Sequence, residues 1–153
     1  MDVASAELLK SCGLRVTRQR LALVDALHDA PHSDTATVLT MVREELPSVS
    51  HQAVYDGLAA LTEAGAVRRI QPAGSVARYE LRVGDNHHHL VCRQCGAIED
   101  VDCAVGTTPC LTAADERSYA IDEAEVNYWG LCPSCLRNTP RTTDTIHPHE
   151  NTL

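Results

Sequence analysis

Apolar residues recur every three to four positions along the first part of the chain, which is the spacing of one face of an α-helix. Two such stretches cover residues 5–12 and 17–29. The stripe of the second stretch consists of Leu21, Val24 and either Leu27 or His28. Thr17 precedes this stripe and carries the hydroxyl typical of a helix N-cap. The pattern therefore predicts two helices before the chain breaks at Pro31.

The same spacing predicts a helix that begins at Asp34 or Thr35 and ends at Pro47. Its apolar stripe is made of Val38, Leu39, Val42 and Leu46. Either Asp34 or Thr35 can cap this helix through its side-chain oxygen.

A further helix is predicted over residues 50–64, with Ser50 as its N-cap and Gly65 as the residue that follows its end. One side of this helix is apolar and consists of Val54, Leu58 and Leu61. The opposite side carries Gln52, Tyr55, Asp56 and Ala59. A polar outward face of this kind suits base edges in a DNA major groove, although a solvated face has the same composition.

Residues 67–71 and 76–81 flank a turn that contains Pro72 and Gly74, and together they predict a β-hairpin. A winged helix-turn-helix has this order of elements, with helices followed by a two-stranded hairpin. Arginines cluster at the start of the second helix (Arg15, Arg18, Arg20) and on the hairpin (Arg68, Arg69, Arg78, Arg82). We expect these side chains to contact DNA phosphates.

The pattern changes after residue 83, beginning with a polar hinge over residues 84–86. Strands are predicted over residues 87–92, 97–102 and 119–128, and a short helix over residues 109–117. The tail from residue 138 has no periodicity and is predicted to be flexible. We therefore expect an α+β protein with a winged-helix domain over residues 1–83 and an α/β domain over residues 84–137, before a tail over residues 138–153.

Charge is distributed unevenly between these two parts. The chain has a net charge of −8, but residues 1–83 carry 9 basic and 10 acidic side chains, against 4 and 11 in residues 84–153. The nearly neutral first part can therefore still dock on DNA. No apolar run of membrane-spanning length and no signal peptide is visible, so we expect a cytoplasmic protein without a membrane partner.

Two Cys-x-x-Cys pairs are the strongest chemical signal in the sequence. Cys92 and Cys95 form the first pair, and Cys132 and Cys135 form the second. Two such pairs supply the four thiolates of a closed structural zinc site. The alternative is a pair of thioredoxin-like redox motifs, which requires a pair at a helix N-terminus within a βαβ unit. No such unit is predicted, so the spacing favours structural Zn²⁺.

A histidine triplet precedes the first cysteine pair. Because side chains alternate along a strand, His87 and His89 share a face and His88 points away. Two imidazoles on one face form half of a metal site, and Glu80, Asp100 and His32 can complete its shell. A mixed nitrogen and oxygen shell suits Fe²⁺, Mn²⁺ or Zn²⁺. Such a site would join the two parts of the chain and make DNA binding metal-dependent.

Three cysteines lie outside the two pairs. Cys103 and Cys110 are either a redox-switchable disulfide or small buried residues, and the sequence leaves both interpretations open. Cys12 is predicted to be a packed, inert thiol. No nucleophile and base stand out as a pair, so neither hydrolysis nor a small-molecule substrate is expected.

The chain resembles the ferric uptake regulator family along about residues 8–137. The resemblance rests on residues 13–20 (GLRVTRQR), 49–58 (VSHQAVYDGL), 64–67 (AGAV), 78–80 (RYE), 87–96 (HHHLVCRQCG) and 129–135 (WGLCPSC). Cys103, Cys110 and residues 122–130 (DEAEVNYWG) are similar to one branch of that family, the actinobacterial repressors of catalase-peroxidase genes.

This resemblance implies a homodimer with an N-terminal winged helix and a C-terminal α/β dimerisation domain. It implies that Tyr55 touches double-stranded DNA and that Arg15 contributes at the minor groove or backbone. It also implies a regulatory site made of His32, Glu80, His87, His89 and Asp100. In peroxide-sensing members an aspartate stands where Asp100 stands, and ferrous iron reacts with peroxide so that a histidine ligand is oxidised.

The chain also departs from the family pattern. Asp56 stands where relatives often have a basic or polar residue, and residues 123–125 (EAE) stand where some members have a histidine of a second metal site. We therefore expect a metal-dependent repressor, activated by iron or manganese and sensing peroxide. The alternatives are an iron- or zinc-sufficiency sensor of the same family and, from another class, a thiol-disulfide enzyme.

Overall fold

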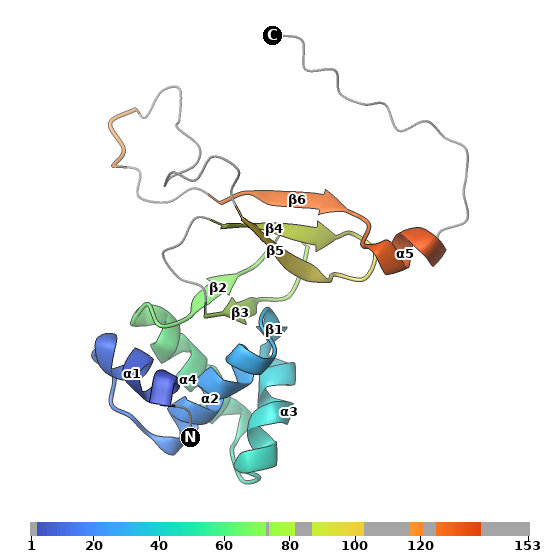
Figure 1. Cartoon of the computed structure of the whole chain (residues 1–153). Helices are drawn as coiled ribbons and strands as arrows, with labels where there is room; N and C mark the ends of the chain where they lie inside the picture. Colours follow the sequence, from blue (N-terminus) through green and yellow to red (C-terminus); the bar gives the residue numbers. More distant parts are fainter. Residues whose placement is uncertain (1–2, 73, 82–86, 103–116, 121–124, 139–153) are drawn as a thin grey trace, which may run out of the picture.

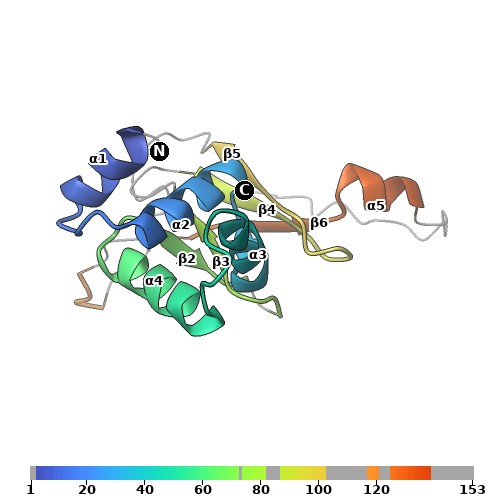
Figure 2. The ribbon, with the colours of Figure 1, turned by 90° about the horizontal axis from the view of Figure 1, so that it is seen from below.

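The computed structural model describes residues 3–72, 74–81, 87–102, 117–120 and 125–138. Four helices form one end of the molecule, a small three-stranded sheet lies next to them, and a second three-stranded sheet lies beyond it (Figure 1). Seen from below, the four helices lie together and the last helix lies away from them, past the end of the second sheet (Figure 2). No helix of the described residues combines the length and the apolar character needed to cross a membrane.

The predicted N-terminal helices are present. They are α1 (Val3–Ser11), α2 (Arg18–Asp29), α3 (Thr35–Glu45) and α4 (His51–Glu63). The predicted N-caps are confirmed, because Thr17, Asp34 and Ser50 each accept a hydrogen bond from the main-chain N–H three residues later. The first helix begins two residues before its predicted start.

A largely aliphatic core holds these helices together, and the chain contains no phenylalanine. Its most buried members include Leu9, Leu23, Leu27, Val38, Val54, Leu58 and Leu61. Helices α2 and α4 approach closely at Gly57, where a Cβ atom would lie 2.5 Å from Leu23 Cδ1. Gln19 Nε2 also donates a hydrogen bond of 2.6 Å to Ala53 O across this contact. The α4 helix is therefore fixed rigidly on α2.

The small sheet contains the predicted hairpin and one strand that was not predicted. Its strands are β1 (Ser33–Asp34), β2 (Arg68–Ile70) and β3 (Arg78–Glu80), in the order β1-β3-β2. The unpredicted strand β1 pairs antiparallel with β3, with Ser33 opposite Tyr79. A two-residue strand has no alternation long enough to appear in a sequence pattern.

The second sheet contains β4 (His87–Cys92), β5 (Ile98–Asp102) and β6 (Asn127–Gly130), followed by helix α5 (Pro133–Asn138). Strand β4 lies in the middle, antiparallel to β5 and parallel to β6. The predicted strand over residues 119–128 was wrong in position, since β6 begins at Asn127 and residues 119–120 are in no strand. The acidic Glu125 disfavours a strand, whereas the aromatic Tyr128 and Trp129 of β6 favour one.

Several predictions fall outside the described residues. These are the hinge over residues 84–86, most of the helix over residues 109–117, the tail after residue 138, and the thiols Cys103 and Cys110. Arg117, the last residue of that predicted helix, lies in a turn with a φ of 46°.

Candidate metal centres

Five side chains from four separate segments converge where the helical end of the molecule meets the second sheet. His32 lies in the turn between α2 and β1, and Glu80 is the last residue of β3. His87 and His89 belong to β4, and Asp100 belongs to β5. These are the five residues of the expected regulatory site.

The strand registers explain this convergence. Because Ser33 is opposite Tyr79, the preceding His32 lies level with Glu80. In the second sheet, His89 is directly opposite Asp100. His87 lies two residues before His89 and therefore on the same face of β4. The pairing of the strands thus places His32 beside Glu80 and His89 beside Asp100. The cluster forms where these two pairs of residues meet.

All three imidazoles point their Nε2 atoms at the two carboxylates. His32 Nε2 lies 2.9 Å from Glu80 Oε2 and 2.8 Å from Asp100 Oδ1. His89 Nε2 lies 3.1 Å and 3.6 Å from the same two oxygens. His87 Nε2 lies 3.3 Å from Glu80 Oε1 and 3.7 Å from Asp100 Oδ1.

The separations fit a shared divalent cation. A cation about 2.1 Å from each donor places neighbouring donors about 3.0–3.4 Å apart, close to the separations found here. Donor atoms of His32, Glu80, His89 and Asp100 all lie within 4.8 Å of one another. Glu80 Oε1 is buried and accepts no hydrogen bond from the described residues, so it has a free lone pair for a cation. The residues therefore fit Fe²⁺, Mn²⁺ or Zn²⁺.

Burial and charge act on the two central groups in opposite directions. Burial raises the pKa of Glu80, but hydrogen bonds from His32 and His89 and the charges of the imidazoles outweigh it and hold the pKa at about 2. Burial lowers the pKa of His32, but its hydrogen bond with Glu80 and the charge of Asp100 raise it above its usual value. The Glu80 carboxylate is therefore ionised and able to bind a cation, whereas protons compete with a cation for His32 at a higher pH than for an isolated imidazole.

We expect the affinity for Mn²⁺ to decrease as the pH is lowered. The decrease should begin at a pH above the ordinary pKa of histidine. Because the pKa of His32 is raised, its proton begins to compete with the metal at a higher pH than an isolated imidazole would allow. Below that pH, His32 alone weakens the affinity by about tenfold per pH unit. Titrations with Mn²⁺ between pH 8 and pH 6 measure this slope, and a flat profile above pH 6.5 would contradict it.

The four paired cysteines form a second cluster at the far end of the second sheet. Cys92 ends β4, Cys95 lies in the following turn, and Cys132 and Cys135 lie at the start of α5. Their four sulfurs lie within 4.8 Å of one another, and the Cys95 and Cys132 sulfurs are 3.7 Å apart. Tetrahedral zinc with bonds of about 2.3 Å places its sulfurs about 3.8 Å apart. The cluster therefore fits structural zinc.

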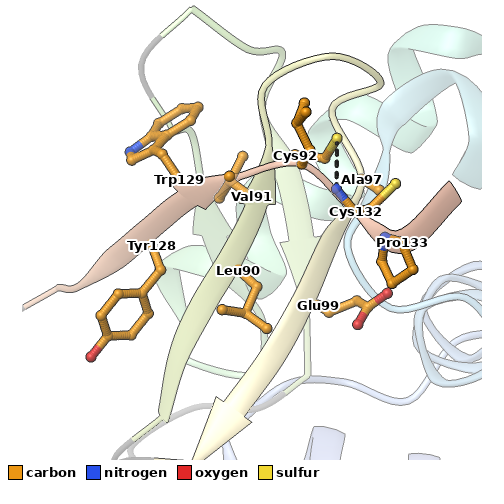
Figure 3. Close-up of a pocket in the computed structure, with 11 residues that line it drawn as sticks. Leu90, Val91, Cys92, Ala97, Glu99, Tyr128, Trp129, Cys132 and Pro133 are labelled. Carbon is orange, nitrogen blue, oxygen red and sulfur yellow. Dashed lines mark hydrogen bonds between the residues drawn. The ribbon is translucent and has the colours of Figure 1, made fainter. Parts of the chain in front are cut away.

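Main-chain N–H groups donate hydrogen bonds to a sulfur of this cluster and favour its thiolate form. Figure 3 shows the N–H of Cys132 directed at Cys92 Sγ, at a distance of 3.3 Å. Hydrogen bonds from the main-chain N–H groups of Cys95 and Cys132 lower the pKa of Cys92 to about 6. The hydrogen bond with Cys132, together with burial, raises the pKa of Cys135 to about 12. The thiol of Cys92 therefore gives up its proton more readily than that of Cys135, whose proton zinc must displace.

The geometry bears on the thiol-disulfide alternative. The second pair lies at a helix start, since Cys132 directly precedes α5 and Cys135 is in its first turn. Helix α5 follows the edge strand β6 and joins no βαβ unit among the described residues. Both pairs face one common centre, which is the arrangement of a metal site and differs from that of two independent redox pairs.

The residues expected at DNA lie together on the helical end of the molecule. Gln52, Tyr55 and Asp56 are exposed on α4, as predicted. Gln52 Nε2 donates to Asp56 Oδ1 at 2.7 Å, so the aspartate orients the glutamine. Arg15 and Arg18 are exposed at the start of α2, whereas Arg20 donates through Nη1 to Arg15 O at 2.9 Å.

Two of the hairpin arginines do not extend to solvent as expected. Arg68 is partly buried, with Nη1 4.0 Å from Glu80 Oε1. Arg78 is partly buried and donates through Nη1 to His32 O at 3.1 Å. Arg68 therefore lies beside the Glu80 carboxylate, Arg78 is held by a main-chain carbonyl, and Arg69 remains exposed. Arg82 lies outside the described residues.

The arrangement has counterparts in known proteins. The model of the ferric uptake regulator family matches residues 11–128. This chain belongs to the ferric uptake regulator family. The transcriptional regulator FurA of Mycobacterium tuberculosis is 65% identical over 138 residues, which cover 90% of this chain and 94% of that protein. The expected likeness to the actinobacterial branch is therefore confirmed.

Solved structures of the family share the fold. The ferric uptake regulator of Helicobacter pylori, described as having three functional metal binding sites, matches with a TM-score of 0.68 at 20% identity. The match covers 86% of this chain and 88% of that protein. A zinc uptake regulator complexed with zinc and DNA matches with a TM-score of 0.66 at 22% identity, covering 88% and 92% of the two chains. The expected α+β fold class is therefore confirmed.

Proposed function

We propose that this chain is a metal-dependent transcriptional repressor that binds double-stranded DNA as a homodimer. The proposal rests on one observation: the side chains of the five-residue cluster come from two different parts of the chain. His32 and Glu80 come from the winged-helix part, and His87, His89 and Asp100 come from the second sheet. A cation in this cluster supplies bonds to both parts at once. Related proteins named as transcriptional and ferric uptake regulators support the DNA-binding role.

The residues of the cluster would act by fixing one arrangement of the two parts. Without a cation, His32 contacts Glu80 and Asp100 only through hydrogen bonds and charge. When a cation binds, the arrangement that brings all donors within bonding distance gains free energy relative to others. If two copies of the winged helix fit neighbouring DNA half-sites only in that arrangement, metal and DNA each tighten the binding of the other.

Helix α4 would enter the major groove and read bases through Tyr55. Tyr55 is 53% exposed and does not belong to the buried stripe of α4. Gln52 would present its carbonyl oxygen, because Asp56 already accepts from its amide nitrogen. Arg15 and Arg18 would contact phosphates.

We expect Tyr55→Ala to weaken operator binding about tenfold without changing the melting temperature. An exposed tyrosine contributes little to the core, so its loss affects DNA contact alone. Fluorescence anisotropy on operator DNA measures the first quantity and thermal unfolding the second. Tyr119→Ala is the matched control, because Tyr119 is exposed but lies outside the winged helix. Equal effects of the two substitutions would contradict the assignment.

The second sheet offers a surface for a second copy. Leu90 on β4 and Tyr128 on β6 are paired in the sheet register, and both are exposed. Figure 3 shows both side chains on the same side of the sheet, opposite Val91 and Trp129. Apolar residues side by side on a sheet face are typical of homodimer interfaces. Sedimentation of the zinc-loaded protein tests this, with a dimer expected.

We further propose that the repressor senses peroxide and controls catalase-type genes. Iron held by the cluster would supply the redox chemistry that splits peroxide beside the bound imidazoles. One peroxide oxygen would be inserted into a histidine ring, which supplies the two electrons overall, and the other oxygen would leave as water. Mass spectrometry of the iron-loaded protein after peroxide tests this through the gain of one oxygen on His32, His87 or His89. Loss of two hydrogens would instead indicate a Cys103–Cys110 disulfide. No modification would favour an iron- or zinc-sufficiency sensor.

A further inference from the structure

Arg78 occupies an unusual position for an arginine of a DNA-binding wing. It begins β3, where its main chain lies opposite Asp34 of β1 and Ile70 of β2. Its side chain is partly buried, and Nη1 donates to the main-chain oxygen of His32, in the turn before β1, at 3.1 Å. A side chain used in this way does not reach phosphates, so its role lies inside the protein.

The hydrogen bond from Arg78 is accepted by His32, the one candidate ligand of the cluster whose main chain has a strained conformation. His32 has a φ of 59°, in the left-handed region that disfavours residues with a Cβ atom. Two contacts stabilise the turn, namely Arg78 Nη1 to His32 O and Ser33 Oγ to Ala30 O at 2.8 Å. The conformation aims His32 Nε2 at Glu80 and Asp100. Holding the carbonyl of His32 therefore fixes the direction of its imidazole.

The same guanidinium reaches the turn that follows the first cysteine pair. A Cβ atom at Gly96 would lie 3.6 Å from Arg78 Nη2. Gly96 follows Cys95 directly, and its N–H donates to Cys92 O at 2.9 Å. Its φ of 71° favours glycine at this position. Arg78 thus lies between the turn that carries His32 and the turn that carries the candidate zinc ligand Cys95.

We propose that Arg78 is a positioning residue for the regulatory cation, acting through the carbonyl of His32. This inference rests on the proposed role of the five-residue cluster as a divalent-cation site. Arg78 touches no donor atom of that site. It keeps His32 in its left-handed turn and seats this turn against the second sheet, which supplies the other imidazoles. Residues that orient a ligand from outside the coordination shell change metal affinity by about 10- to 100-fold when removed.

The test compares Mn²⁺ affinity in two methionine substitutions. Arg78→Met keeps the length and apolar part of the side chain but removes its hydrogen bonds. We expect its Mn²⁺ dissociation constant to rise by about 10- to 100-fold with the zinc content unchanged. Arg69→Met is the matched control, because Arg69 lies on the adjacent strand β2 and is exposed. It should bind Mn²⁺ as the unsubstituted protein does.

A spectroscopic measurement separates positioning from general destabilisation. Co²⁺ bound to the cluster has a visible spectrum that depends on the number and type of its ligands. We expect the spectrum of Arg78→Met to approach that of His32→Ala, whereas a destabilised protein with an intact site keeps the original spectrum. Arg78→Lys retains one donor and should restore part of the Mn²⁺ affinity.

The outcomes decide between the claims. Unchanged Mn²⁺ affinity and an unchanged Co²⁺ spectrum in Arg78→Met would overturn the inference while leaving the proposed function intact. An unsubstituted protein that binds no Mn²⁺ at this cluster would overturn both. If Arg78→Met does not retain zinc, Arg78→Lys decides: weakened Mn²⁺ binding with full zinc content supports the inference, and unaltered binding contradicts it.

Discussion

Replacement of Cys92 by serine is expected to abolish zinc binding and unfold the second sheet. Cys92 ends the central strand β4, and Cys132 follows the parallel edge strand β6, so zinc would join the ends of both strands. A structural zinc ion contributes about 10–16 kcal/mol to the folding of a zinc-finger peptide. The whole free energy of unfolding of a typical domain is only about 5–15 kcal/mol. The packing of the three-stranded second sheet cannot replace such a contribution.

The measurements for Cys92→Ser are zinc content by elemental analysis and unfolding by circular dichroism. Cys12→Ser is the matched control, because Cys12 is a partly buried thiol packed against the helical core, away from the four-sulfur cluster. It should retain one zinc per chain and a melting temperature within a few degrees of the unsubstituted protein. A Cys92→Ser protein with full zinc content and an unchanged melting temperature would contradict the assignment of the four cysteines.

Glu80→Gln is expected to weaken Mn²⁺ binding by at least about 100-fold, the upper end of the effect of removing a supporting residue. Glu80 is 1% exposed and contacts all three imidazoles. Its pKa of about 2 keeps it ionised at neutral pH. Glutamine has nearly the same shape but carries no charge, and its NH₂ group cannot coordinate a cation. Isothermal titration with Mn²⁺ measures the loss, and DNA binding should no longer respond to the metal.

The control for this experiment is Glu99→Gln on strand β5. Glu99 is exposed and immediately precedes Asp100, so it points away from the cluster. The same chemical change there should leave Mn²⁺ affinity within about twofold of its original value, since exposed charges interact weakly. If Glu80→Gln and Glu99→Gln bind Mn²⁺ equally well, the cation site lies elsewhere.

The helical half of the molecule was largely predictable because its signals are local. Thr17, Asp34 and Ser50 cap the helices where the sequence places them, and the stripe of Val54, Leu58 and Leu61 is buried. Apolar spacing and capping oxygens act over a few residues, so they can be interpreted without knowledge of the tertiary fold.

The parts that could not be predicted depend on contacts between distant segments. Strand β1 exists because Ser33 pairs with Tyr79, and neither residue alone signals a strand. The inward turn of Arg78 depends on the carbonyl of His32, which is 46 residues away in the sequence. Strand β6 begins at Asn127 because its pairing with His89 sets the register. The candidate ligands were found because imidazoles, carboxylates and thiols are chemically distinctive, whereas a supporting arginine has no such signature.

The measurement that tests the central claim most directly is anisotropy binding to DNA from the region upstream of the protein's own gene. The zinc-loaded protein is titrated with chelator, Mn²⁺, Fe²⁺ or Zn²⁺, before and after peroxide. We expect Mn²⁺ or Fe²⁺ to tighten binding by about 5- to 150-fold, the usual range of coupling between two sites, and peroxide to abolish binding only in the iron form. Equal affinity with chelator and with every metal would contradict the claim that the five-residue cluster controls DNA binding.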